Sequence, residues 1–352
     1  MIPTEPIGSI PRPDELLAAM QAAADGSIEA AELDARFDEA VRDTIAQMEA
    51  TGSPVVTDGE QRKPSFATYP VHGLASLAAG GVVIPFADGH TRQLPVITEG
   101  PFRYETHADA YLRAALPAAS RPVKQAVISA SALSLLYPAD GIEGYSRDAF
   151  IADLVDEAEA DIRGCLDAGA HCVQIDFTEG RLALKLDPSA GLLRSFVELN
   201  NSVLDRFDDT ERQKIGVHSC PGGDHDSTHS ADVDYAALLP LLFELHAGAF
   251  YLELAGEHDP EAVLETIAAN VQPGQRVFVG VTDPIDPKVE TPEEVRDRVL
   301  LAARHIPLDQ LGTTDDCGFS PFADDRSTAR ETAFAKIRAR VEGTALAADQ
   351  LA

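Results

Sequence analysis

Short apolar runs rich in β-branched residues alternate with longer amphipathic segments along most of the chain. Buried strands of a parallel sheet are typically short apolar runs, and amphipathic segments between them indicate helices that cover the sheet. The alternation therefore predicts an α/β fold with a parallel sheet. We expect eight strands, at residues 5–9, 54–58, 125–129, 172–176, 215–219, 250–254, 277–281 and 311–315.

Two of the intervening segments carry clear helix signals. In residues 147–168, apolar side chains such as Phe150, Leu154 and Ile162 recur every three or four positions, which places them on one helical face. Residues 291–303 open with Thr291, a proline and two glutamates, which suit the N-cap, the first position and the first turn of a helix. We predict that both segments are helices packed on the sheet.

The number of alternating units indicates a TIM (β/α)8 barrel that forms a single domain over residues 1–352. Residues 28–50 predict an N-terminal helical arm. The stretch after the second strand, residues 61–124, is longer than an ordinary connection and contains a predicted hairpin at residues 82–97. Such an insertion is typical of a lid or a subunit contact, so the sequence leaves a homo-oligomer open.

The charge of the chain narrows the classes of partner. There are 58 acidic and 28 basic residues, which gives a formal net charge of −30. A field this negative repels phosphate backbones and anionic lipid headgroups, so we expect neither nucleic acid nor a membrane as a partner. The sequence has no apolar run of ~18 residues, and its N-terminus lacks a basic region followed by an apolar stretch. We therefore expect a cytoplasmic protein.

Several common catalytic motifs are absent from the sequence. It contains no G-x-G-x-x-G after a strand, no G-x-x-x-x-G-K-[ST], no G-x-S-x-G and no H-E-x-x-H. These absences weigh against dinucleotide oxidoreductases, P-loop nucleotidases, elbow-type hydrolases and common zinc proteases.

The four cysteines are too few for a disulfide scaffold in a chain of 352 residues. Cys165 and Cys172 lie inside a predicted helix and a predicted strand, where a buried thiol behaves as a small apolar side chain. Cys220 and Cys317 follow predicted strands, which makes them candidates for metal ligands or nucleophiles.

Polar residues occur at the carboxyl end of each predicted strand. Active sites of TIM barrels are built at this rim of the sheet, so we expect the polar residues to converge there. They are Ser9, Glu60, Ser131, Asp176, His218 with Cys220, Glu253, Asp283 and Cys317.

The sharpest feature of this rim is the sequence I-G-V-H-S-C-P-G-G at residues 215–223. Because side chains alternate along a strand, His218 and Cys220 should point to the same face about 6–7 Å apart along the strand. Cys317 ends the last strand and can add a second thiolate, and Glu253 can add an oxygen ligand. Imidazole and thiolate ligands with an exchangeable position are typical of catalytic zinc sites.

A second group of potential ligands follows in D-H-D-S-T-H-S-A-D-V-D at residues 224–234. On a helix, His225 and His229 would lie on one face because they are four residues apart. The preceding glycines favour a loop instead. The sequence therefore leaves open whether these residues bind a metal or line the pocket.

In the order of its motifs, the chain resembles the C-terminal catalytic half of cobalamin-independent methionine synthase. The resemblance spans essentially the whole chain. It rests on I-G-S-x-P-R-P at residues 7–13, D-G-E at 58–60, Q-I-D at 174–176, H-x-C at 218–220, Y-L-E at 251–253 and D-D-C-G at 315–318.

This resemblance implies a zinc-dependent methyltransferase of methionine biosynthesis that passes a methyl group to the thiol of homocysteine. It implies a metal site formed by His218, Cys220, Glu253 and Cys317, with Glu257 as an alternative to Glu253. It also implies that residues 7–9, chiefly Ile7 and Ser9, bind homocysteine through the backbone, and that Glu60 and Asp176 hold its amino group. No catalytic residue is expected beyond the metal site.

The sequence leaves the methyl donor open. The family stacks the folate ring of methyltetrahydrofolate on a tryptophan and places a histidine in the loop after the seventh strand, but this chain has no tryptophan and no histidine in residues 282–288. The alternatives are a zinc-dependent thiol alkyltransferase that uses an epoxide or a methylcorrinoid, a metal-free decarboxylase resembling uroporphyrinogen decarboxylase, and a non-catalytic docking protein for a methyl carrier.

Overall fold

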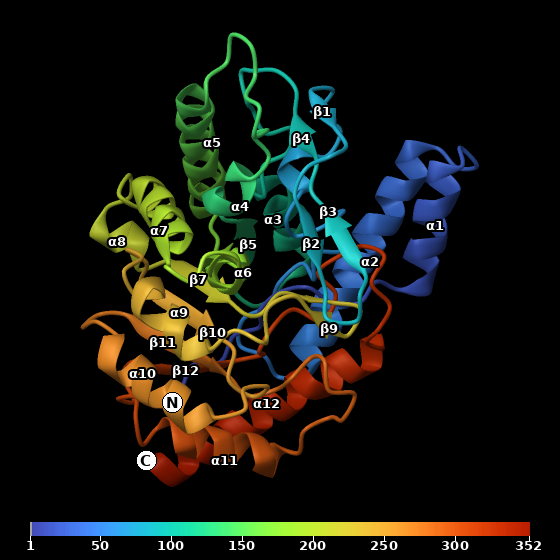
Figure 1. Ribbon diagram of the computed structural model, residues 1–352. Helices are drawn as coiled ribbons and strands as arrows, with labels where there is room; N and C mark the ends of the chain where they lie inside the picture. Colours follow the sequence, from blue (N-terminus) through green and yellow to red (C-terminus); the bar gives the residue numbers. More distant parts are fainter. Residues whose placement is uncertain (1) are drawn as a thin grey trace.

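The computed structural model describes residues 2–352, and a six-stranded parallel sheet lies at its centre (Figure 1). Apart from Arg276, every residue of these strands is buried, as expected for a parallel sheet covered by helices. In spatial order the strands are β12 (Leu311–Thr314), β11 (Arg276–Gly280), β10 (Ala249–Leu252), β7 (Ile215–Ser219), β6 (Val173–Asp176) and β5 (Gln125–Ile128). Six of the eight expected strands are thereby confirmed.

The expectation of regular strands at residues 5–9 and 54–58 is wrong. A single parallel bridge joins Thr4 to Thr313 of β12, and another joins Val56 to Val123 just before β5. Prolines at positions 3, 6 and 54 bring no N–H donor to a ladder, which explains why the pairing stays this short.

These two extended segments nevertheless bring the edges of the sheet together. The backbone N–H of Ile10 donates to the Gly59 carbonyl oxygen at 3.0 Å. The Thr57 hydroxyl donates to the Gly8 carbonyl oxygen at 2.8 Å. Six strands and two extended segments therefore follow one another in the cyclic order of an α/β barrel.

Helices pack outside this sheet (Figure 1). Both predicted helices are confirmed, as α5 and α11, and the Thr291 side chain accepts a hydrogen bond from the Glu294 backbone N–H in a capping box. The helix α3 (Asp109–Ala115) lies within the insertion. The helices that follow the insertion are α4 (Ala130–Ser134), α5 (Arg147–Asp167), α6 (Glu179–Leu186), α7 (Gly191–Leu204), α8 (Asp209–Arg212), α9 (Tyr235–Leu242), α10 (Pro260–Asn270), α11 (Pro292–Ala302) and α12 (Arg330–Leu351).

The predicted N-terminal arm consists of α1 (Asp14–Ala24) and α2 (Ala30–Ala50), which pack on each other. α2 also contacts α3 and α12. It therefore belongs to the outer layer of helices, where the helix between the first two barrel segments is expected.

The insertion between residues 61 and 124 contains the predicted hairpin, in which β2 (Val83–Pro85) pairs with β3 (Thr91–Gln93). A second antiparallel pair, β1 (Leu77–Ala78) with β4 (Val96–Ile97), lies at its base, and the insertion also holds the short 3-10 helices η1 (Tyr69–Val71) and η2 (Leu116–Ala118). The backbone N–H of Ala87, in the hairpin loop, donates to the carbonyl oxygen of Thr228 at 2.9 Å. The insertion is thereby fixed to the loop that follows β7.

That loop forms a small hairpin of its own, in which β8 (Gly223–Asp224) pairs with β9 (Ser227–Thr228). His225 and Asp226 occupy its turn with φ of 49° and 56°, the left-handed conformation that tight hairpin turns require. The alternative of a helix carrying His225 and His229 is therefore wrong. Among the helices of residues 2–352, none is long and apolar enough to cross a membrane.

Candidate active site

His218, Cys220 and Cys317 form one cluster at the carboxyl ends of the strands. His218 lies on β7, Cys220 directly follows β7, and Cys317 lies in the loop after β12. One nitrogen or sulfur atom from each residue lies within 4.8 Å of the others. Two parts of the chain separated by almost one hundred residues therefore offer potential metal ligands to a single point.

The orientation of the His218 ring is fixed from the neighbouring strand. Its Nδ1 lies 3.0 Å from the Tyr251 carbonyl oxygen, and because a carbonyl only accepts, Nδ1 carries the hydrogen. Nε2 is buried and has no hydrogen-bond partner among the described residues. A free lone pair on an imidazole whose other nitrogen donates to a carbonyl is the arrangement of metal-binding histidines.

The two thiols of the cluster act on each other. Their Sγ atoms are 3.1 Å apart, which exceeds the S–S bond length of about 2.05 Å, and both cysteines are free. The hydrogen bond from Cys220 lowers the pKa of the Cys317 thiol well below its usual value, against the opposing effect of burial. Cys317 is therefore set up as a thiolate, the form that binds metals.

The two acidic candidates lie at the edge of this cluster, where both contact Arg181. Arg181 Nη1 is 3.3 Å from Glu253 Oε2 and 2.6 Å from Glu257 Oε1. Glu253 is buried, whereas Glu257 is half-buried, and the charge of Glu253 acts on the Cys220 thiol. Neither carboxylate belongs to the compact group of three ligand atoms found in the described chain. Glu253 is the better placed of the two.

A small cavity of about 30 Å³ adjoins the cluster. His218 and Cys317 form one of its walls. The residues expected to bind the amino acid also line it, namely Ile7, Ser9, Glu60 and Asp176. The structure thus brings together, around one cavity, residues from five widely separated sequence motifs.

The electrostatics of this cavity favour a cation. Burial raises the pKa of Asp176 to about 6, and the nearby Glu60 adds to the effect. Gln174 Nε2 donates to Asp176 Oδ1 at 2.7 Å, and the Lys63 ammonium lies 2.8 Å from Glu60 Oε1. Two buried carboxyl groups with one compensating lysine are suited to bind a substrate ammonium group.

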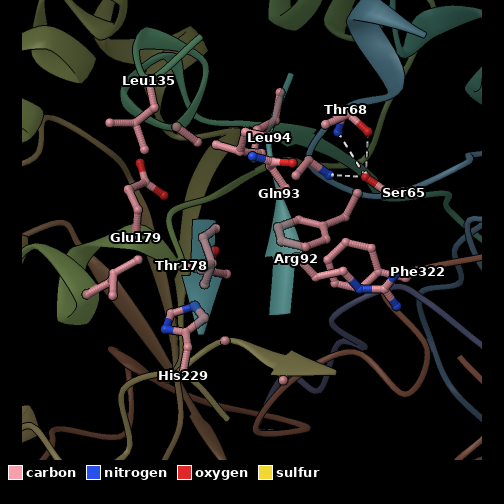
Figure 2. Close-up of a pocket in the computed structure, with 18 of the residues that line it drawn as sticks. Ser65, Thr68, Arg92, Gln93, Leu94, Leu135, Thr178, Glu179, His229 and Phe322 are labelled. Carbon is pink, nitrogen blue, oxygen red and sulfur yellow. Dashed lines mark hydrogen bonds between the residues drawn. The ribbon is translucent and has the colours of Figure 1, made fainter. Parts of the chain in front are cut away.

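A larger cavity of about 380 Å³ lies beside the small one, and both share Phe66, Thr178, Gly222 and Gly223 as lining residues. Figure 2 shows Glu179, His229 and Arg92 around it, together with the apolar side chains of Leu94, Leu135 and Phe322. The polar groups are few and the walls mostly apolar, as in sites for organic ligands.

The second candidate metal group is divided by the structure. His229 lines the larger cavity, whereas His225 lies near Asp224 and Asp325 at the tip of the β8–β9 hairpin. Asp224 is already paired, because Arg92 Nη2 donates to its Oδ1 at 3.1 Å. The contact between Asp224 and Arg92 joins the β8–β9 hairpin to the insertion. The sequence left open whether the histidines bind a metal or line the pocket, and His229 lines the pocket.

Sequence reasoning missed Glu179 and Arg181, which both come from α6. Glu179 is the first residue of α6 and Arg181 lies five positions after Asp176. The one available signal was their position directly after a strand with a polar end. The two remaining cysteines, Cys165 and Cys172, are buried as expected.

The fold and the site define this molecule as an α/β barrel with a thiol- and imidazole-containing pocket at the carboxyl ends of its strands. The chain belongs to the family described as "Cobalamin-independent synthase, Catalytic domain", whose family model matches residues 2–344.

Individual relatives agree with this assignment. The chain is 23% identical over 351 residues to a methionine synthase of Sulfurisphaera tokodaii, covering 100% of this chain and 94% of that protein. It is 24% identical over 325 residues to a Streptomyces griseus 5-methyltetrahydropteroyltriglutamate–homocysteine methyltransferase, covering 90% of this chain and 39% of that longer protein. The structure of a B12-independent methionine synthase from Shewanella sp. W3-18-1 superposes with a TM-score of 0.76 at 18% identity, covering 100% of this chain and 99% of that one. This last likeness supports the barrel fold.

Proposed function

We propose that this protein is a zinc-dependent methyltransferase that passes a methyl group to the thiol of homocysteine and so forms methionine. The observation that carries the proposal is the position of His218, Cys220 and Cys317 beside the cavity lined by Glu60 and Asp176. A metal-binding group and an ammonium-binding group lie around one small space, which matches the two ends of a thiol amino acid.

The donor set fits zinc. His218, Cys220 and Cys317 would hold the ion, because two thiols and an imidazole with a free Nε2 are ligands that zinc prefers. Glu253 would complete the set as the acidic ligand, since it is more buried than Glu257 and acts on Cys220. Bound there, zinc supplies the positive charge that keeps a substrate thiol deprotonated near neutral pH.

The chain itself orients the substrate. Glu60 and Asp176 hold the ammonium group, and the backbone of residues 7–9 faces the same cavity to bind the carboxylate. With the ammonium and carboxylate groups held there, the sulfur at the other end of homocysteine would lie at the group formed by His218, Cys220 and Cys317, and the larger cavity beside it would hold the methyl donor. Such positioning lowers the barrier to transfer because the reacting atoms no longer have to find each other.

A transfer assay with the full chain tests this function. Zinc-loaded protein is incubated with L-homocysteine and either 5-methyltetrahydropteroyltriglutamate or methylcobalamin, and methionine is measured by mass spectrometry. We expect methionine to form with at least one donor and to disappear after chelation of zinc. Formation of methionine at equal rate in metal-free protein, or no methionine with either methyl donor, would contradict the proposal.

A further inference from the structure

Glu179 is a buried carboxyl group on the wall of the larger cavity. It is only 5% exposed, and Figure 2 shows its carboxyl group among the residues that surround the cavity. Its Oε2 makes no hydrogen bond within the described chain. A buried polar atom without a hydrogen-bond partner costs free energy. The position of Oε2 beside a cavity therefore indicates that a bound ligand supplies the missing hydrogen bond.

The hydrogen bonds of the other carboxyl oxygen determine where a proton resides. Asn200 Nδ2 donates to Ser131 Oγ at 2.6 Å, and the Ala132 N–H donates to Ser129 Oγ at 3.1 Å. The hydroxyls of both serines donate to Glu179 Oε1, and Ser131 Oγ also lies 3.3 Å from Ser129 Oγ. Because Oε1 is occupied by these two hydrogen bonds and Oε2 has no partner, Oε2 is the oxygen that is free to carry a proton and pass it to a ligand.

The protonation state agrees with this arrangement. Burial raises the pKa of Glu179 to about 7, against the lowering effect of its two serine partners. The charge of Asp176, on the neighbouring strand β6, raises it further. His229, which directly follows β9, and Arg92 of β3 line the same cavity. Near neutral pH, Glu179 is therefore in the range in which a carboxyl group works as a general acid.

The position of Glu179 relates it to the reacting thiol. The preceding residue, Thr178, lines both cavities. Glu179 therefore lies next to the junction through which a methyl group passes from the larger cavity to the sulfur.

We propose that Glu179 donates the proton on Oε2 to the departing half of a methyl donor whose methyl group is carried on an amine nitrogen. This rests on the function proposed above. The sulfur of homocysteine forms a bond to the methyl carbon while the carbon–nitrogen bond breaks and its electron pair stays on nitrogen. That nitrogen takes the proton, Glu179 becomes a carboxylate, and solvent protonates it again when the demethylated donor leaves.

A comparison of two donors in Glu179→Gln tests the proposal. The amide keeps the shape of the side chain but has no transferable acidic proton. With 5-methyltetrahydropteroyltriglutamate we expect kcat to fall about 100-fold or more, while KM changes little. With methylcobalamin, whose cobalt leaves without taking a proton, we expect the rate to remain near that of the wild type.

Two further variants separate proton transfer from a structural role. Glu179→Asp keeps an acidic proton one methylene further from the cavity, so it should recover part of the lost rate with the amine donor. Glu198→Gln, an exposed position on α7, is the matched control and should behave as the wild type. Equal loss with both donors, an unchanged rate in Glu179→Gln, or a wild type that uses methylcobalamin but no amine donor would each overturn the proposal.

An infrared measurement examines Glu179 without turnover. The difference spectrum between wild type and Glu179→Gln should show a protonated carboxyl band at pH 6 that disappears as the pH rises through about 7. Absence of that band at pH 6 would contradict the proposal that Glu179 donates a proton. Failure of the proposed function has a different signature, because the wild type would then form methionine from neither donor whatever the infrared result.

Discussion

His218 and Tyr251 are joined across neighbouring strands by a hydrogen bond of 3.0 Å from Nδ1 to the backbone carbonyl oxygen. This contact determines the tautomer and directs the free Nε2 into the cluster with Cys220 and Cys317. A metal ligand held in its binding orientation in advance loses little conformational freedom when the ion binds. In the proposed zinc site, the strand register would thus contribute to metal affinity.

His218→Gln should weaken zinc binding by a factor on the order of 10–100 or more, because the amide replaces the imidazole nitrogen with a poorer ligand. Competition with a chromogenic chelator measures the affinity. His229→Gln is the matched control, since His229 lines the larger cavity and lies outside the cluster. Equal zinc affinity in the wild type and His218→Gln would show that His218 is not a ligand.

Substitutions of Glu253 and Glu257 should have opposite effects on zinc binding, although both residues contact Arg181. Glu253→Gln should release zinc more readily and lose methyl transfer, because an amide binds zinc more weakly than a carboxylate. Glu257→Gln should keep both the metal and most of the activity. Zinc content after dialysis distinguishes them, and the reverse result would assign the acidic ligand to Glu257.

Asp176→Asn should raise KM for homocysteine by a factor on the order of 10–100, since a hydrogen bond to a charged group contributes about 1.5–3 kcal/mol. The thiol 4-mercaptobutanoate has no amino group and serves as the internal control. Its KM should be nearly the same in the wild type and the variant. A parallel loss for both thiols would mean that Asp176 acts on the fold or the metal instead of the ammonium group.

We expect Glu5 to account for part of the stability that the folded protein loses at low pH. Burial by itself would raise the pKa of Glu5, but His171, Lys124 and Tyr251 lower it to about 2 from 4.5. A carboxyl group with a lowered folded-state pKa stabilises the protein above about pH 4.5, and this contribution is lost as the pH falls toward 2. The full contribution is on the order of 3 kcal/mol.

Urea unfolding at pH 7 and pH 3.5 measures this effect. The free energy of unfolding of Glu5→Gln should fall less between these two pH values than that of the wild type, because the amide does not titrate. Glu15→Gln, at an exposed position of α1, should retain the wild-type difference. If the free energy of unfolding depends on pH in the same way in the wild type and in Glu5→Gln, Glu5 does not contribute to the loss of stability in acid.

The sequence predicted the elements whose signals are local. The strands that became β5, β6, β7, β10, β11 and β12 are apolar runs, and the caps of α11 are visible in four consecutive residues. Regular strands were wrongly predicted at residues 5–9 and 54–58, because the prediction relied on apolar composition and gave too little weight to prolines, which cannot donate a hydrogen bond to a β-ladder. The single-domain organisation, the cytoplasmic location and the oligomeric state stay predictions.

For the site, the sequence identified residue types with intrinsic chemistry, such as the H-x-C pair at positions 218 and 220. For Glu179 the sequence offered only its position directly after a strand with a polar end, because the importance of that residue depends on which of its two oxygens is left free. Likewise, the contact of Arg181 with two competing glutamates exists only in three dimensions. Roles defined by unfilled hydrogen-bonding capacity require coordinates.

Zinc content is the most direct test of the central claim that Cys220 and Cys317 jointly hold a metal. Wild type, Cys220→Ala, Cys317→Ala and the buried control Cys165→Ala are purified, dialysed and analysed by elemental mass spectrometry. We predict close to one zinc per chain in the wild type and in Cys165→Ala, and little zinc and no methyl transfer in the other two variants. Full zinc content and activity in either Cys220→Ala or Cys317→Ala would contradict the account.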